Sequence, residues 1–146
     1  MSHEGRFGNL LRVREAAEQR REREVVALLA RARRLGSRLR TRAGELRALD
    51  EELSRPTGVQ PAAWAQRRER RRAWLRQGLE GLREEMVALE QELYRARQAL
   101  TEAARDTKAV ERLRDRDREA RAQRLRALEQ AQHDLLALLR HMREGS

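Results

Sequence analysis

The feature that most constrains the fold is an apolar repeat with alternating steps of three and four residues. In the first half of the chain it occupies positions 25, 28, 32, 35, 39, 42, 46, 49 and 53, and only Arg42 interrupts it. Because an α-helix turns once every 3.6 residues, this spacing places the repeat on one narrow stripe of a helix. Such a stripe is too narrow for the core of a globular domain and is typical of a two- or three-helix coiled coil.

The second half of the chain carries the same repeat from Leu75 to Val110 and again from Leu125 to Met142. Between these stretches Leu113 comes one residue early, which is a local slip in the phase of the repeat. Charged residues make up 40% of the chain and aromatic residues 3%, so there are too few large apolar side chains for a compact multi-layer core. We predict an all-α fold.

Both prolines of the chain lie within residues 54–61, with Gly58 between them. Proline breaks a helix by removing a backbone donor and by clashing with the preceding turn. We therefore predict two long helices that pack as an antiparallel coiled-coil hairpin, with the break at 54–61. We expect a single elongated coiled-coil domain over 1–146. It would have arm one at about 9–53, a tip at about 54–84 and arm two at about 85–143.

Two registers of the hairpin are open. A tight turn places Leu53 opposite Ala62, brings the acidic residues 50–52 near the basic residues 67–72, and leaves the Leu125–Met142 seam unpaired. The second register places residues 18–24 opposite residues 114–124 and buries more apolar surface. It requires the chain to break near Gly78 and Gly81, with a short tip helix at 62–77. We favour the second register, because exposed charge pairs contribute little.

The charge of the chain suggests anionic partners. The 34 basic and 24 acidic residues give a net charge of +10, and Lys108 is the only lysine. There is no cysteine, no apolar run of the roughly 20 residues that a membrane helix needs, and no signal-peptide pattern, so we expect a soluble cytoplasmic protein.

The sequence contains no phosphate-binding, zinc-finger or metalloprotease spacing. His133 and His141 have no third ligand placed near them. We therefore expect no enzyme activity, no cofactor and no metal.

Four segments resemble the family of the flagellar export protein FliJ and its injectisome relatives of the YscO type. They are LLRVREAAEQRRE at residues 10–22, GVQPAAW at 58–64, WLRQGLEGL at 74–82, and VERLRDRDREARAQRLRALEQAQHDLLA at 110–137. The resemblance covers nearly the whole chain. The leucine-rich end, with Leu135-Leu136 and Leu138-Leu139, departs from the family pattern and leaves the flagellar and injectisome branches open.

This resemblance implies a non-enzymatic stalk or adaptor subunit of a type III protein-export ATPase complex. It implies that the paired termini bind a hexameric export ATPase and promote its assembly, and that the tip contacts a membrane export-gate protein. Export chaperones are the third implied partner. The implied location is cytoplasmic, peripheral at the inner face of the cell membrane through these partners.

Two sets of residues are candidates for these contacts. Arginines near the two termini would give a cationic end for acidic loops of a ring, with a solvated coiled-coil face as the alternative. An aromatic and leucine cluster near the tip would contact the gate, with packing inside the tip as the alternative. The ring-end set is Arg12, Arg14, Arg20, Arg21, Arg23, Arg112, Arg114, Arg116, Arg118 and Arg121. The tip set is Trp64, Trp74, Leu75, Leu79 and Leu82.

Two other functions compete with the stalk. The basic run 67–72 (RRERRR) would suit a nucleic-acid-binding coiled coil, although acidic residues interrupt the other basic stretches and aromatic stacking platforms are missing. A generic scaffold that forms parallel dimers through arm one or the last seam is the other. We expect no nucleic-acid partner and a monomer in solution.

Overall fold

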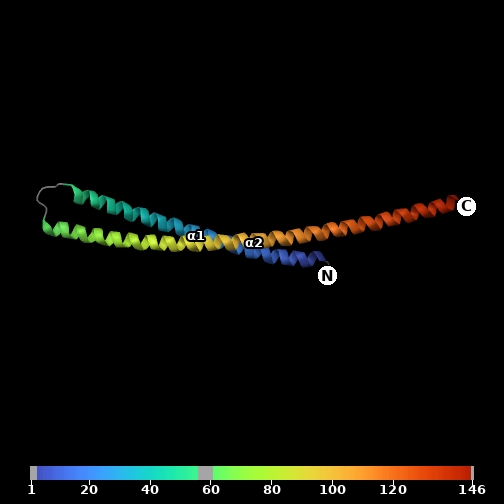
Figure 1. Ribbon diagram of the computed structural model, residues 1–146, viewed down its shortest axis with the longest axis horizontal. Coiled ribbons are helices and arrows are strands. Elements are labelled where there is room, and N and C mark those ends of the chain that lie inside the picture. Colours follow the sequence, from blue (N-terminus) through green and yellow to red (C-terminus); the bar gives the residue numbers. More distant parts are fainter. Residues whose placement is uncertain (1–2, 56–60, 146) are drawn as a thin grey trace. The chain divides into compact units, whose positions relative to one another are not determined.

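The computed structural model describes residues 3–55 and 61–145, which form two antiparallel α-helices (Figure 1). Helix α1 spans His3–Ser54 and helix α2 spans Ala62–Glu144. The antiparallel helical hairpin and the break between Ser54 and Ala62 are therefore confirmed. The prediction that Pro56 and Gly58 cause the break falls on residues 56–60, which lie outside the described residues.

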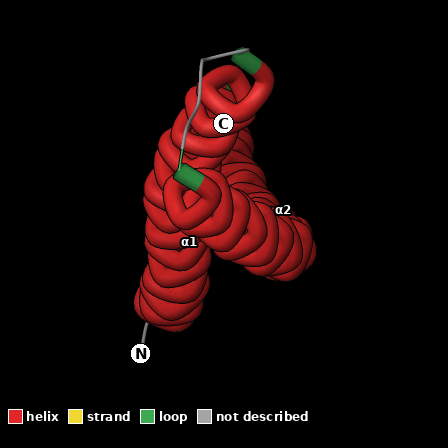
Figure 2. Tube along the Cα trace, turned by 90° about the vertical axis from the view of Figure 1, so that its left-hand side faces the viewer, coloured by secondary structure: helices red, strands yellow, loops and turns green. Residues whose placement is uncertain are grey.

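Both helices use residues that favour helix, chiefly alanine, leucine, glutamate and arginine. At the start of α2 the Pro61 carbonyl accepts hydrogen bonds from the Trp64 amide at 2.9 Å and the Ala65 amide at 3.4 Å, which satisfies two donors of the first turn. Helix α1 begins at His3, so the expected start near residue 9 is too late. Among the described residues between α1 and α2, Figure 2 shows loop structure at each end of the connection.

By their contacts the two helices divide into two parts, which we describe separately. The hairpin part is Gln19–Thr101, and the terminal part is Met1–Glu18 with Glu102–Ser146. In the hairpin part the predicted seam residues form the core. Leu75 has an exposed fraction of only 1%. The central cluster consists of Leu35, Leu82 and Leu89, packed against Leu28, Ala32, Leu39 and Met86.

Ion pairs between the helices fix the register of the hairpin part. Near the connection the Arg72 Nε lies 2.8 Å from the Asp50 Oδ1, and the Arg68 guanidinium contacts the Glu52 carboxylate. Farther along, the Arg31 Nη1 lies 3.6 Å from the Glu92 Oε2. These pairs belong to the tight-turn register.

The favoured second register is therefore wrong. Residues 62–77 do not form a separate tip helix, because α2 continues through them and through Gly78 and Gly81 without a break. A glycine inside a helix costs only about 1 kcal/mol relative to alanine, whereas a break would end a long run of backbone hydrogen bonds. Residues 62–84 thus belong to the paired helix rather than to a folded tip.

In the terminal part, the first turns of α1 pack against the middle of α2. Leu11, Thr107 and Val110 are buried there, and the Arg14 Nη1 lies 3.5 Å from the Asp106 Oδ2. The Thr107 hydroxyl donates to the Ala103 carbonyl at 3.0 Å, so the buried oxygen is satisfied within its own helix.

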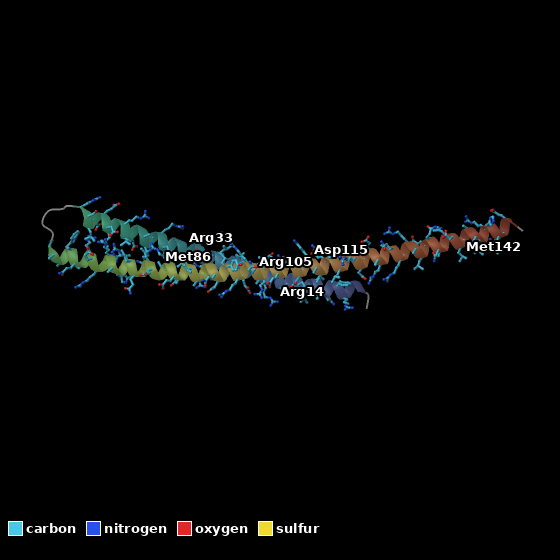
Figure 3. All side chains as sticks on the ribbon, in the orientation of Figure 1. Arg14, Arg33, Met86, Arg105, Asp115 and Met142 are labelled. Carbon is cyan, nitrogen blue, oxygen red and sulfur yellow. The ribbon has the colours of Figure 1, made fainter. Side chains whose placement is uncertain are left out.

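Helix α2 continues beyond the start of α1. Every residue from 122 to 145 is exposed, and we call this segment the C-terminal extension. Figure 3 shows its side chains, with Met142 near its end. Its large apolar side chains are all exposed: Leu125, Leu128, Leu135, Leu136, Leu138, Leu139 and Met142.

Candidate functional site

The ten arginines predicted for the ring end do not all belong to one part of the structure. Arg12 and Arg14 of α1 lie in the terminal part. Five more arginines of the terminal part come from α2. The remaining three belong to the hairpin part. The α2 set is Arg112, Arg114, Arg116, Arg118 and Arg121. The hairpin-part set is Arg20, Arg21 and Arg23.

Several of these arginines have local acidic partners. The Arg114 Nη2 lies 3.5 Å from the Asp115 Oδ1, and the Arg121 Nε lies 3.3 Å from the Asp117 Oδ2. In α1 the Arg21 Nη1 lies 3.2 Å from the Glu24 Oε2. These partners offset part of the positive charge, so the surface that α2 presents is a mixture of both signs.

Arg12, Arg112 and Arg116 are exposed members of the terminal part. Exposed guanidinium groups keep their five donors available for planar anions such as carboxylates. These three residues are therefore the members of the set best placed to meet an acidic partner.

The predicted tip set separates into core and surface. Leu75, Leu79 and Leu82 are buried in the seam of the hairpin part, so they hold the two helices together and offer no surface to a partner. Trp64 and Trp74 are the accessible members. Trp74 directly precedes the buried seam residue Leu75. Its side chain therefore points about 100° away from the seam.

Arginine guanidinium groups lie against the rings of both tryptophans. The Arg68 guanidinium lies 4.9 Å from the centroid of the Trp64 ring. Around Trp74 the guanidinium groups of Arg42 and Arg71 lie 4.9 and 5.8 Å from the ring centroid.

Trp74 still has an exposed fraction of 54% despite these contacts. The Glu45 Oε2 holds both guanidinium groups, at 3.4 Å from the Arg42 Nη1 and 3.6 Å from the Arg71 Nη2. Stacking and ion pairing together hold the Trp74 side chain at the surface, where it can contact a partner without first being ordered.

The basic run 67–72 is largely paired within the chain. Three of its arginines contact acidic residues of α1: Arg68 with Glu52, Arg71 with Glu45, and Arg72 with Asp50. The sequence contains a signal for this pairing, since the acidic residues 50–52 match the basic run in a tight turn. The paired charges weaken the case for this run as a phosphate-binding patch.

The described ranges 3–55 and 61–145 show neither a metal-binding group nor a membrane-spanning helix. They contain no group of three or more His, Asp or Glu side chains that could hold a metal ion. Neither of the helices described is long and apolar enough to cross a membrane.

Comparison with protein families gives a match over nearly the whole chain. A family model described as Flagellar FliJ protein matches residues 3–146 of the chain. Neither the curated proteins nor the solved structures gave a match. The family match covers both helices and both parts of the structure.

Proposed function

The chain belongs to the flagellar FliJ protein family, and we propose that it acts as a non-enzymatic stalk and adaptor subunit of the flagellar export ATPase complex. The family is a non-catalytic component of flagellar export, so the chain is an export-related protein that associates with the export apparatus. The proposal adds three roles to this: promoting assembly of a hexameric export ATPase, coupling it to the membrane export gate, and handling export chaperones.

The terminal part is the proposed contact for the ATPase ring. The observation that carries this assignment is the set of exposed guanidinium groups at Arg12, Arg112 and Arg116, on two paired helices. Acidic loops of an ATPase ring could pair with these exposed guanidinium groups, and such pairing needs no rigid binding pocket. Electrostatic attraction of this kind speeds association and orients the partner more than it raises affinity.

The connection end of the hairpin part is the proposed contact for the export gate. Trp64 and Trp74 support this role, because tryptophan is enriched among the residues that dominate binding energy at interfaces. Through these contacts the protein would lie on the cytoplasmic face of the membrane as a peripheral component.

The ATPase contact is tested by charge reversal. The purified chain is mixed with the flagellar export ATPase, and binding and ATP hydrolysis are measured at low and at physiological salt. Combining Arg12→Glu, Arg112→Glu and Arg116→Glu is expected to reduce binding at low salt by at least about tenfold and to abolish its salt dependence.

The matched control carries Arg33→Glu, Arg40→Glu and Arg47→Glu. These are three exposed arginines of α1 in the hairpin part, and the change in net charge is the same. Arg33 is marked in Figure 3. The control is expected to bind nearly as the unmodified chain does. Equal losses in both variants would mean that only net charge matters, and no binding by the unmodified chain would refute the stalk function.

The gate contact needs its own variant. Replacing Trp64 and Trp74 by alanine is expected to weaken binding to the cytoplasmic part of the export gate while leaving ATPase stimulation intact. The replacements remove apolar contact area at one end only. If the double variant instead lost ATPase stimulation and kept gate binding, the two proposed contacts would be assigned to the wrong ends.

A further inference from the structure

The C-terminal extension continues the face of α2 that packs against α1. Counting in sevens from the buried Thr107 gives Arg114, Arg121, Leu128, Leu135 and Met142. Positions seven apart lie on the same side of a coiled-coil helix. The exposed leucines of the extension therefore lie in line with the seam that α1 covers farther back.

The cover that α1 gives to this face of α2 stops before residue 122. Stepping one residue at a time from the Arg14–Asp106 pair places His3 level with about residue 117 of α2. Asp117, Ala120 and Arg121 are still partly buried, and from residue 122 onward every residue is exposed. The uncovered segment to Glu144 is about 35 Å long at 1.5 Å per residue.

We propose that a second copy of this chain occupies this uncovered seam, with the two C-terminal extensions paired antiparallel. In this arrangement the extension of the second copy takes the place along α2 that α1 would fill if it were longer. It also runs in the same direction as α1. The existing two-helix seam thus continues across the junction.

The lengths and the charges of the extension suit pairing with itself. Two antiparallel extensions have the same length, so each ends where the other chain's α1 begins. Residues 122–145 contain four arginines and three acidic residues, which gives the extension a net charge of +1, whereas the whole chain carries +10. Self-association through this segment therefore meets little of the repulsion that the rest of the chain would cause.

The order of residues is complementary in the antiparallel orientation. When Leu125 faces Met142 of the second copy, Leu128 faces Leu139 and Leu135 faces Gln132. In this register the flanking Glu129 approaches Arg143 of the other chain, and the two-fold symmetry repeats the attraction at the far end.

Gln132 is the polar position of this seam. The two-fold axis passes close to it, so the two glutamines come to adjacent layers, where their amides can bond to each other. A single polar layer of this kind fixes register at some cost in stability.

A parallel pair fits less well because of α1. In a parallel pair, residue 121 of one chain would lie beside residue 121 of the other, where each α2 already carries its own α1. Both α1 helices would then occupy the space between the two α2 helices. The antiparallel pair avoids this, because the α1 helices lie at opposite ends of the paired segment.

The mass of the purified full chain in solution, measured by sedimentation across a range of concentrations, tests the proposal without any export partner. In place of the monomer expected from the sequence alone, we expect a dimer of twice 17.1 kDa that dissociates on dilution. The double variant Leu135→Glu/Leu139→Glu is expected to be monomeric at every concentration. Its hairpin fold, followed by circular dichroism, is expected to be retained because neither residue is buried in the hairpin.

The matched control is Ala137→Glu, which adds a charge on the opposite side of the same helix and is expected to remain dimeric. A monomeric unmodified chain at all concentrations would overturn the proposal, and so would a dimer that survives Leu135→Glu/Leu139→Glu. Because the dimer needs no ATPase, its absence would leave the stalk function untouched.

Disulfide trapping tests whether the two extensions pair antiparallel or parallel. Since the chain has no cysteine, only the introduced thiols can form a disulfide. Chains with Leu128→Cys are mixed with chains carrying Leu139→Cys and are then oxidised. The antiparallel pair predicts disulfides chiefly between unlike chains. Disulfides chiefly between like chains would show a parallel pair and overturn the proposed arrangement.

Discussion

Truncating Leu89 to alanine tests whether the cluster in the hairpin part carries the stability of the two helices. Leu89 has an exposed fraction of 3% and packs in the central cluster with Leu35 and Leu82. Leu→Ala removes three carbon groups, or about 2.4 kcal/mol at roughly 0.8 kcal/mol per buried group. The cavity left behind adds to this cost in a large core. In a seam only two helices wide the neighbours can close in, so we expect a loss of about 2–3 kcal/mol.

Urea unfolding followed by far-UV circular dichroism measures this loss. With a slope of about 1–3 kcal/mol per molar urea, the midpoint is expected to fall by about 0.7–3 M. Val87→Ala is the control, since Val87 lies on the same helix with an exposed fraction of 55%, and its effect is expected to stay within about 0.5 kcal/mol. If the two variants unfolded at the same urea concentration, the assignment of Leu89 to the core would be refuted.

Three further predictions concern the register, the glycines and the extension. Asp50→Ala and Arg72→Ala, combined in a double-mutant cycle of urea unfolding, are expected to show a coupling of about 1 kcal/mol, because the pair is partly covered and lies 2.8 Å apart; a coupling of zero would argue against the tight-turn register. Gly78→Ala is expected to stabilise the protein by about 0.5–1 kcal/mol, because a Cβ there meets nothing within 4 Å and alanine favours helix, so a lower urea midpoint would contradict the uninterrupted helix. In dilute solution, amides of residues 122–145 are expected to exchange with deuterium faster than those of residues 75–110, and equal protection would show that the extension is covered within its own chain.

The spacing of apolar residues, together with the two prolines at 54–61, was enough to predict the helices and their antiparallel pairing. Val25, Leu35 and Leu49 are buried, as the repeat in the first arm predicts. A repeat of this length has few alternatives, because both helix formation and burial of the stripe favour the same structure.

The register was predicted wrongly, since it depends on a balance between two weak preferences. Apolar burial favoured sliding the arms, whereas the charges at Asp50 and Glu52 favoured the tight turn. The continuity of α2 determines the register. Residues 62–84 gain a backbone hydrogen bond at nearly every position, and the helix-destabilising effect of Gly78 and Gly81 does not offset that gain. Continuity of a helix is a cooperative property that no single residue in the sequence displays.

The candidate surfaces remain predictions, and the sequence alone could not separate them from buried seams. A stripe of leucines next to tryptophans looks the same in the sequence whether it faces a second helix of the chain or an outside partner. The one-position offset between Trp74 and Leu75 separates the two cases, and it becomes decisive only once the neighbouring helix is in place. For the same reason the sequence marked the Leu125–Met142 seam as apolar but could not say what covers it.

The complete exposure of residues 122–145 separates two kinds of constraint on sequence change. Substitutions in the hairpin part act first on stability, since its leucines are shared between two helices. Substitutions in the extension leave that packing unaltered, so recognition by this segment can change without a cost to the hairpin. Substitutions at the end of α2 are therefore expected to alter the proposed pairing of two copies without lowering the stability of the hairpin.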